Sequence, residues 1–125
     1  MKQLFEKTSI NGIELKNRFI RSATWERKAD DSGHLTERLL KVYEDLADGG
    51  SAAIITGYAY VIREEQPNPG MMGIYDDSFI DEYRKLTETV HSRGSKIILQ
   101  LVYGGSFTWF NTAGRVIWGP SAVPN

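Results

Sequence analysis

The sequence predicts an α/β fold in which parallel strands alternate with amphipathic helices. Three short apolar segments, at 19–22, 52–58 and 96–101, have the aliphatic content of buried parallel strands. Two segments with helical periodicity, at 37–48 and 79–93, lie between them. Strand, helix, strand, helix, strand at this spacing corresponds to two right-handed βαβ units in one sheet.

The composition is that of a globular domain and excludes several classes of function. Of the 125 residues, 41% are hydrophobic and 25% are charged, with a formal net charge of −1. This balance offers no basic surface for nucleic acid and no reason to expect a membrane partner. The absence of cysteine excludes disulfides, thiolate metal sites and thiol nucleophiles. Because no segment resembles a leader or a membrane span, we expect a cytoplasmic protein.

A β-hairpin is expected before the first strand. Asn11 and Gly12 lie between two short alternating segments, and both central residues of a type I′ turn need positive φ. The first strand then follows Arg18 and ends in the small residues Ser22 and Ala23. Small residues there would let a flat ligand approach the backbone.

The first helix is expected to begin after Thr36 and to end at Gly49, which are typical capping residues. Its apolar positions recur at i, i+3, i+4 and i+7, at Leu39, Val42, Tyr43 and Leu46. The second strand follows the helix, with a glycine near its end. The loop at 63–69, charged and proline-bearing, is expected to be exposed.

The second helix is expected to end at Gly94, and Ser78 with Asp81 resembles a capping box at its start. The third strand, Lys96 to Leu101, is apolar except for Gln100 near its end. A buried amide is costly unless something pairs with it. At the carboxyl end of a parallel strand, that partner is often a ligand.

The segment from Val102 to Asn125 has no helical pattern and is rich in glycine and aromatic residues. We expect a long loop over the carboxyl ends of the strands. Three parallel strands also leave two open edges and need cover on both faces. Residues 1–125 are therefore expected to be an incomplete part of a single domain.

Several short motifs follow one another in an order that resembles one family. They are Leu15-Lys16-Asn17-Arg18, Ala29-Asp30 with Gly33 and Thr36, Gly73-Ile74-Tyr75-Asp76-Asp77, Leu99-Gln100-Leu101 and Pro120-Ser121-Ala122. Their order and spacing resemble the N-terminal part of the Old Yellow Enzyme-like, FMN-dependent NAD(P)H:flavin oxidoreductases. The resemblance spans essentially the whole chain.

The resemblance implies the N-terminal portion of an FMN-binding TIM (β/α)₈ barrel, with flavin over its C-terminal mouth. In that family NADH or NADPH reduces FMN, and hydride passes to a small-molecule acceptor such as an activated alkene. A complete barrel needs eight strands and about 250 residues. The substrate-binding histidines, the tyrosine proton donor and the phosphate-binding arginines of the family would lie beyond Asn125, so no catalytic residue is assigned here.

The resemblance also implies flavin contacts at the ends of the three strands. The main chain after the first strand falls on Ser22, Ala23 and Thr24, followed by Trp25 where the family usually has Thr or Cys. The position at the end of the second strand, usually Gly or Ala, is Tyr58. The glutamine that hydrogen-bonds the flavin pyrimidine edge falls on Gln100.

Other polar residues have structural interpretations. Glu64-Glu65 and Asp76-Asp77 are interpreted as solvent-exposed side chains rather than as paired carboxylates of a site. Neither His34 nor His91 is assigned a functional role or a metal.

The sequence is compatible with two functions. The chain is either a segment of an FMN oxidoreductase or a truncated, non-catalytic module. As partners we expect the remainder of the barrel or copies of the chain itself, in a homo-oligomer. A flavodoxin-like domain would need a glycine-rich phosphate loop after the first strand, which the sequence lacks.

Overall fold

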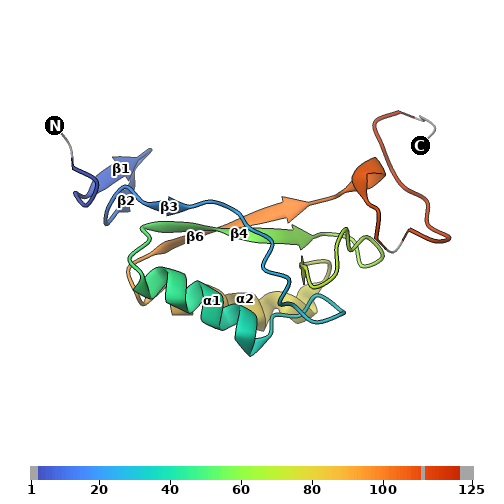
Figure 1. The fold of residues 1–125 in the computed structure, drawn as a ribbon, viewed down its shortest axis with the longest axis horizontal. Helices are drawn as coiled ribbons and strands as arrows, with labels where there is room; N and C mark the ends of the chain where they lie inside the picture. The colour runs from blue at the N-terminus through green and yellow to red at the C-terminus, as the bar shows by residue number, and fades with distance from the viewer. Residues whose placement is uncertain (1–2, 111, 122–125) are drawn as a thin grey trace.

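Two helices cover one face of a parallel sheet in the computed structural model, which describes residues 3–110 and 112–121 (Figure 1). The elements in chain order are β1 Thr8–Ile10, β2 Ile13–Leu15, β3 Ile20–Arg21, α1 Glu37–Asp48, β4 Ala53–Tyr60, β5 Met72–Gly73, the 3₁₀ turn η1 Asp77–Phe79, α2 Ile80–His91, β6 Lys96–Val102 and the 3₁₀ turn η2 Gly105–Phe107. The expected hairpin is present as β1 and β2, with positive φ at both Asn11 and Gly12.

The sheet is built around β4, and all of its pairings are parallel. Strand β6 pairs along one edge of β4, while β3 pairs at Ala53–Ile54 and β5 at Ala59–Tyr60. The predicted order of three parallel strands is therefore confirmed. Strand β5 was not predicted, because two residues are too short to show a periodic pattern.

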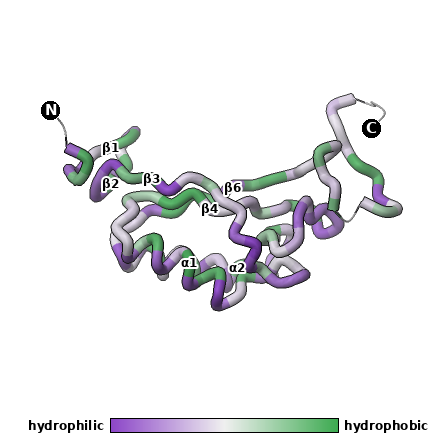
Figure 2. Tube along the Cα trace, in the orientation of Figure 1, coloured by the Kyte–Doolittle hydropathy of each residue, from purple (hydrophilic) through white to green (hydrophobic). Residues whose placement is uncertain are grey.

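The main core lies between the helices and the sheet. Its buried members come from the stripes of both helices, from β4 and β5, and from the loop before α1: Leu35, Leu39, Leu40, Tyr43, Ala47, Ile54, Ala59, Met72, Leu86 and Val90. Figure 2 shows apolar stretches within β4 and β6. Of the helices in the described part of the chain, none has the length and apolar character that spanning a bilayer requires.

The helix caps confirm one prediction and correct another. Thr36 caps α1, because its Oγ1 accepts from the Leu39 amide at 3.2 Å. The capping box predicted from Ser78 and Asp81 is wrong, since Asp76 Oδ1 accepts from the Ser78 amide at 3.0 Å instead. The physical reason is η1, which precedes α2 and moves the first unpaired amides toward the N-terminus.

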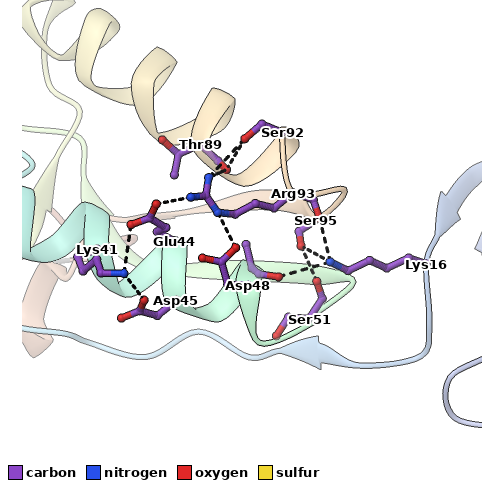
Figure 3. Close-up of polar contacts among 11 residues, drawn as sticks. Lys16, Lys41, Glu44, Asp45, Asp48, Ser51, Thr89, Ser92, Arg93 and Ser95 are labelled. Carbon is purple, nitrogen blue, oxygen red and sulfur yellow. Dashed lines mark hydrogen bonds and ion pairs between the residues drawn. The ribbon is translucent and has the colours of Figure 1, made fainter.

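The helices are joined at their C-terminal ends by Arg93 (Figure 3). Its guanidinium donates to Asp48 of α1 at 2.8 Å and to the Thr89 carbonyl of α2 at 2.9 Å. It also pairs with Glu44 of α1. One side chain therefore fixes the spacing of α1 and α2.

Lys16, just after the hairpin, reaches the same end of the sheet (Figure 3). Its ammonium donates to the carbonyls of Ala47 at 3.5 Å and Arg93 at 3.0 Å, and to Ser95 Oγ at 3.0 Å. The Ala47 carbonyl lies in the last turn of α1 and the Arg93 carbonyl lies two residues after α2, so both are at helix C-terminal ends, where a cation is favoured. Lys16 thereby attaches the hairpin to both helices.

Candidate functional site

The residues predicted to form a site come together at the carboxyl ends of three neighbouring strands. Tyr58 of β4 lies directly beside Gln100 of β6 in the strand register. The segment 22–25 follows β3, which pairs with the other edge of β4. Tyr58 and Gln100 thus lie side by side, and the segment 22–25 runs along the other edge of β4, where the Thr24 carbonyl lies against Gly57.

A β-bulge in β4 adjusts this end of the sheet. Ile55 pairs with Ile98 and Tyr58 pairs with Gln100, so β4 uses one more residue than β6 between the two pairs. At the bulge the Thr56 hydroxyl, in place of a backbone carbonyl, accepts a hydrogen bond from the Gln100 amide at 3.1 Å. The same hydroxyl donates to the Gly57 carbonyl at 2.8 Å.

The bulge decides which face of the sheet Tyr58 occupies. Ile54 and Ala59 are both buried in the helix-side core although they are five positions apart. Side chains alternate along a regular strand, so one extra residue must lie between them. Tyr58 therefore shares the face of Ile55 and Gln100, away from the helices, and is 41% exposed.

Gly57 brings the segment after β3 close to the bulge. A Cβ at this position would lie 2.6 Å from the Thr24 carbonyl oxygen, so only glycine fits. The Gly57 amide donates to the Tyr43 hydroxyl at 3.0 Å. Burial raises the pKa of that hydroxyl, because it disfavours the charged phenolate.

The segment 22–25 is held at both of its ends. Arg21 donates to the Ser22 carbonyl at 2.8 Å and forms an ion pair with Glu26, so one salt bridge spans the four residues. Between these ends, Ser22, Thr24 and Trp25 are exposed. Ser22, Thr24 and Trp25 therefore lie at the surface, although the Thr24 carbonyl packs against Gly57.

Gln100 has an unused hydrogen-bonding atom. Its Oε1 is buried and has no partner among the described residues. A buried amide oxygen is ordinarily paired, so its position calls for a donor that the described chain does not supply. Together with the exposed residues Ser22, Thr24 and Tyr58, this arrangement suits a flat heterocycle carrying N–H groups.

One expectation about this end of the sheet is wrong. The loop 63–69 was predicted to be exposed, yet Glu65 is fully buried, with Gln66 and Pro67 also buried. The reason is a contact with the loop after β6, where Glu65 Oε1 accepts from the Gly104 amide at 3.0 Å. The solvated interpretation of Glu65 fails for the same reason.

Sequence reasoning did not assign the contacts that Tyr43, Thr56, Gly57 and Glu65 make at this end of the sheet. A glycine inside a strand pattern is a known signal of a bulge and could have identified Gly57. Glu65 carries no such signal, because its burial depends on Gly104, 39 residues later. Within 3–110 and 112–121, no group of three or more acidic or histidine side chains is arranged to hold a metal ion.

Comparison with known proteins gives a consistent family match. Residues 3–116 match the NADH:flavin oxidoreductase / NADH oxidase family. The chain is 32% identical over 104 residues to an N,N-dimethylglycine/sarcosine dehydrogenase of Chromohalobacter salexigens, covering 82% of this chain and 15% of that protein. It is 33% identical over 116 residues to a probable flavin mononucleotide-dependent alkene reductase of Leishmania infantum, and the match covers 91% of this chain and 31% of that protein.

A solved structure matches over almost the whole chain. The old yellow enzyme homologue of Zymomonas mobilis superposes with a TM-score of 0.84 at 24% identity, covering 98% of this chain and 34% of that protein. At this identity the match establishes the fold, which corresponds to part of that enzyme's barrel. The chain spans about a third or less of the length of each of these three proteins.

Proposed function

Because the chain belongs to the NADH:flavin oxidoreductase / NADH oxidase family, we propose that it forms the N-terminal part of an FMN-dependent oxidoreductase and supplies one side of the flavin site. When bound, FMN supplies hydride chemistry, with NADH or NADPH as reductant and an activated alkene as acceptor. The alkene reductase of Leishmania infantum supports this acceptor class. Turnover would require groups outside this chain.

The observation that carries the proposal is the unpartnered Oε1 of Gln100 at the carboxyl end of β6. It would accept a hydrogen bond from a ring N–H of the flavin, and the rest of the amide would orient the ring edge. The main chain of 22–24 would hold the opposite part of the ring system. Trp25 and Tyr58, both 41% exposed, would restrict its position and exclude water.

Flavin titration tests the role of Gln100. Gln100→Leu is expected to weaken FMN binding by about 1–3 kcal/mol, because a partly buried polar contact is lost. Gln3→Leu is the matched control, since Gln3 is exposed at the other end of the chain. The measurement is flavin fluorescence quenching on the polypeptide that carries the complete barrel. Equal affinity of Gln100→Leu and wild type would remove Gln100 from the site.

The sheet face opposite the helices favours a second candidate function, in which the chain is a non-catalytic module that associates. Ile20 is 46% exposed and Ile98 is 50% exposed on this face, where they pair with Ala53 and Ile55 of β4. Apolar surface of this kind is stabilised when a partner covers it. We propose that the remaining barrel strands or a second copy of the chain cover it.

Absorbance and light scattering distinguish the two candidates. A purified 125-residue chain that is yellow, with flavin bands near stoichiometry, supports the oxidoreductase segment. A colourless associated species supports the module. A monodisperse species of 14.1 kDa that unfolds cooperatively would contradict association, and NAD(P)H oxidation by that species above the rate of free flavin would contradict the need for the missing groups.

A further inference from the structure

A cavity lies between the loops that follow β4 and β6, beside the candidate flavin site but separate from its residues. Its volume is about 290 Å³. The lining combines acidic, aromatic and aliphatic side chains with one guanidinium: Ile62, Glu64, Glu65, Tyr103, Arg115 and Trp118. None of these residues has a part in the flavin proposal.

Glu65 gives this cavity an unused acceptor. The side chain is fully buried, and its Oε1 accepts from the Gly104 amide at 3.0 Å and from the Thr108 hydroxyl. The other oxygen, Oε2, is buried and has no partner among the described residues. A carboxylate oxygen accepts hydrogen bonds, and leaving it buried and unpaired is costly.

The position of the carboxylate is fixed by close packing. A Cβ at Gly104 would lie 2.9 Å from Glu65 Oε1 and 2.3 Å from Thr108 Oγ1, so the glycine is required. The Tyr103 hydroxyl accepts from the Trp118 amide at 2.8 Å, which holds the far wall of the cavity. The two hydrogen bonds to Oε1 therefore hold the carboxylate in place before any ligand arrives.

Charge and shape select the ligand. Two carboxylates and one guanidinium line the cavity, which favours a cation. The rings of Tyr103 and Trp118 suit a cation or an apolar body. We propose that this cavity binds a protonated amine whose ammonium donates to Glu65 Oε2 and whose apolar part packs against Trp118.

The ammonium group has two possible sources with the same chemistry. One is a small aromatic or aliphatic amine, and the other is a lysine side chain of the polypeptide that completes the barrel. Neither source involves FMN, so amine binding in this cavity can be tested independently of flavin binding.

The test is an NMR titration of the 125-residue chain with benzylammonium chloride, using benzyl alcohol as the uncharged probe. The Gly104 amide is the reporter, because it donates to the same carboxylate. We expect its resonance to shift with benzylammonium and not with benzyl alcohol. Equal responses to the two probes would overturn the proposal.

Variants assign the effect to Glu65. Glu65→Gln keeps an acceptor for Gly104 but replaces Oε2, and should weaken benzylammonium binding at least tenfold. Glu64→Gln, at the exposed neighbour, should change affinity less than threefold. If Glu65→Gln does not fold, Trp118→Leu replaces it as the decisive variant, because Trp118 is 69% exposed and should also lower affinity. Unchanged affinity in the decisive variant would overturn the proposal.

N-acetyl-lysine methylamide distinguishes the two sources. If it binds as tightly as benzylammonium, the natural occupant is a lysine side chain. If benzylammonium binds at least tenfold more tightly, the occupant is a small amine with an apolar body. Failure of both probes to bind would refute the site.

Discussion

Replacing Gly57 with alanine tests the packing that brings the segment after β3 to the bulge. The added Cβ would lie 2.6 Å from the Thr24 carbonyl oxygen, whereas ordinary contact begins at 3.4 Å. The two backbones must therefore separate by about 0.8 Å (3.4 − 2.6). A carbonyl cannot rotate away as a side chain can, so we expect a loss of about 1–3 kcal/mol in the free energy of unfolding.

Urea unfolding followed by tryptophan fluorescence measures this loss at matched protein concentration. Gly119→Ala is the control, since the nearest atom to its Cβ is the Ser121 carbonyl oxygen at 3.5 Å. That variant should be neutral or slightly stabilised, by up to about 1 kcal/mol. Gly57→Ala should also weaken FMN binding, because Thr24 moves. A Gly57→Ala chain that unfolds at the wild-type urea concentration would refute the reasoning.

Two further predictions concern stability. Lys16→Met should lower the free energy of unfolding by about 2 kcal/mol, because charged hydrogen bonds to the ends of both helices are lost. Lys41→Met, at an exposed ion pair, should lower it much less. Equal losses for the two variants in urea unfolding would contradict the role of Lys16. Hydrogen bonds from Ser78 lower the pKa of Asp76 in the folded chain. The ionised Asp76 carboxylate therefore stabilises the folded state at pH values above its ordinary pKa. This stabilisation is lost as the pH falls through the lowered pKa of the folded chain. Thermal unfolding below about pH 4 should accordingly depend less on pH in Asp76→Asn than in wild type, and parallel curves would contradict this.

The sheet and helices could be predicted because their signals are local. Periodic apolar positions placed α1 and α2 within two residues of their observed ends, and aliphatic runs located β4 and β6. The position of Gln100 near the carboxyl end of a parallel strand followed from its place in the sequence, whereas Ser22 and Tyr58 were assigned from the family resemblance. Their contact with flavin remains a prediction.

The remaining features depend on contacts between distant residues. The face of Tyr58 is set by the bulge at Thr56, which is stabilised by the amide of Gln100, 44 residues later. The burial of Glu65 depends on a loop that folds back after β6. Neither contact has a pattern in the residues around it, so local reasoning placed Glu65 in solvent.

The three acceptors of Lys16 also impose an order on chain assembly. The acceptors lie 31, 77 and 79 residues further along the chain. At a synthesis rate of about 5–20 residues per second, the last of them emerges about 4–16 s after the lysine itself. The βαβαβ framework can collapse over its own short connections during that time, whereas closing the long loop to Lys16 costs more chain entropy. We therefore expect the N-terminal hairpin to form early and to dock after the βαβαβ framework.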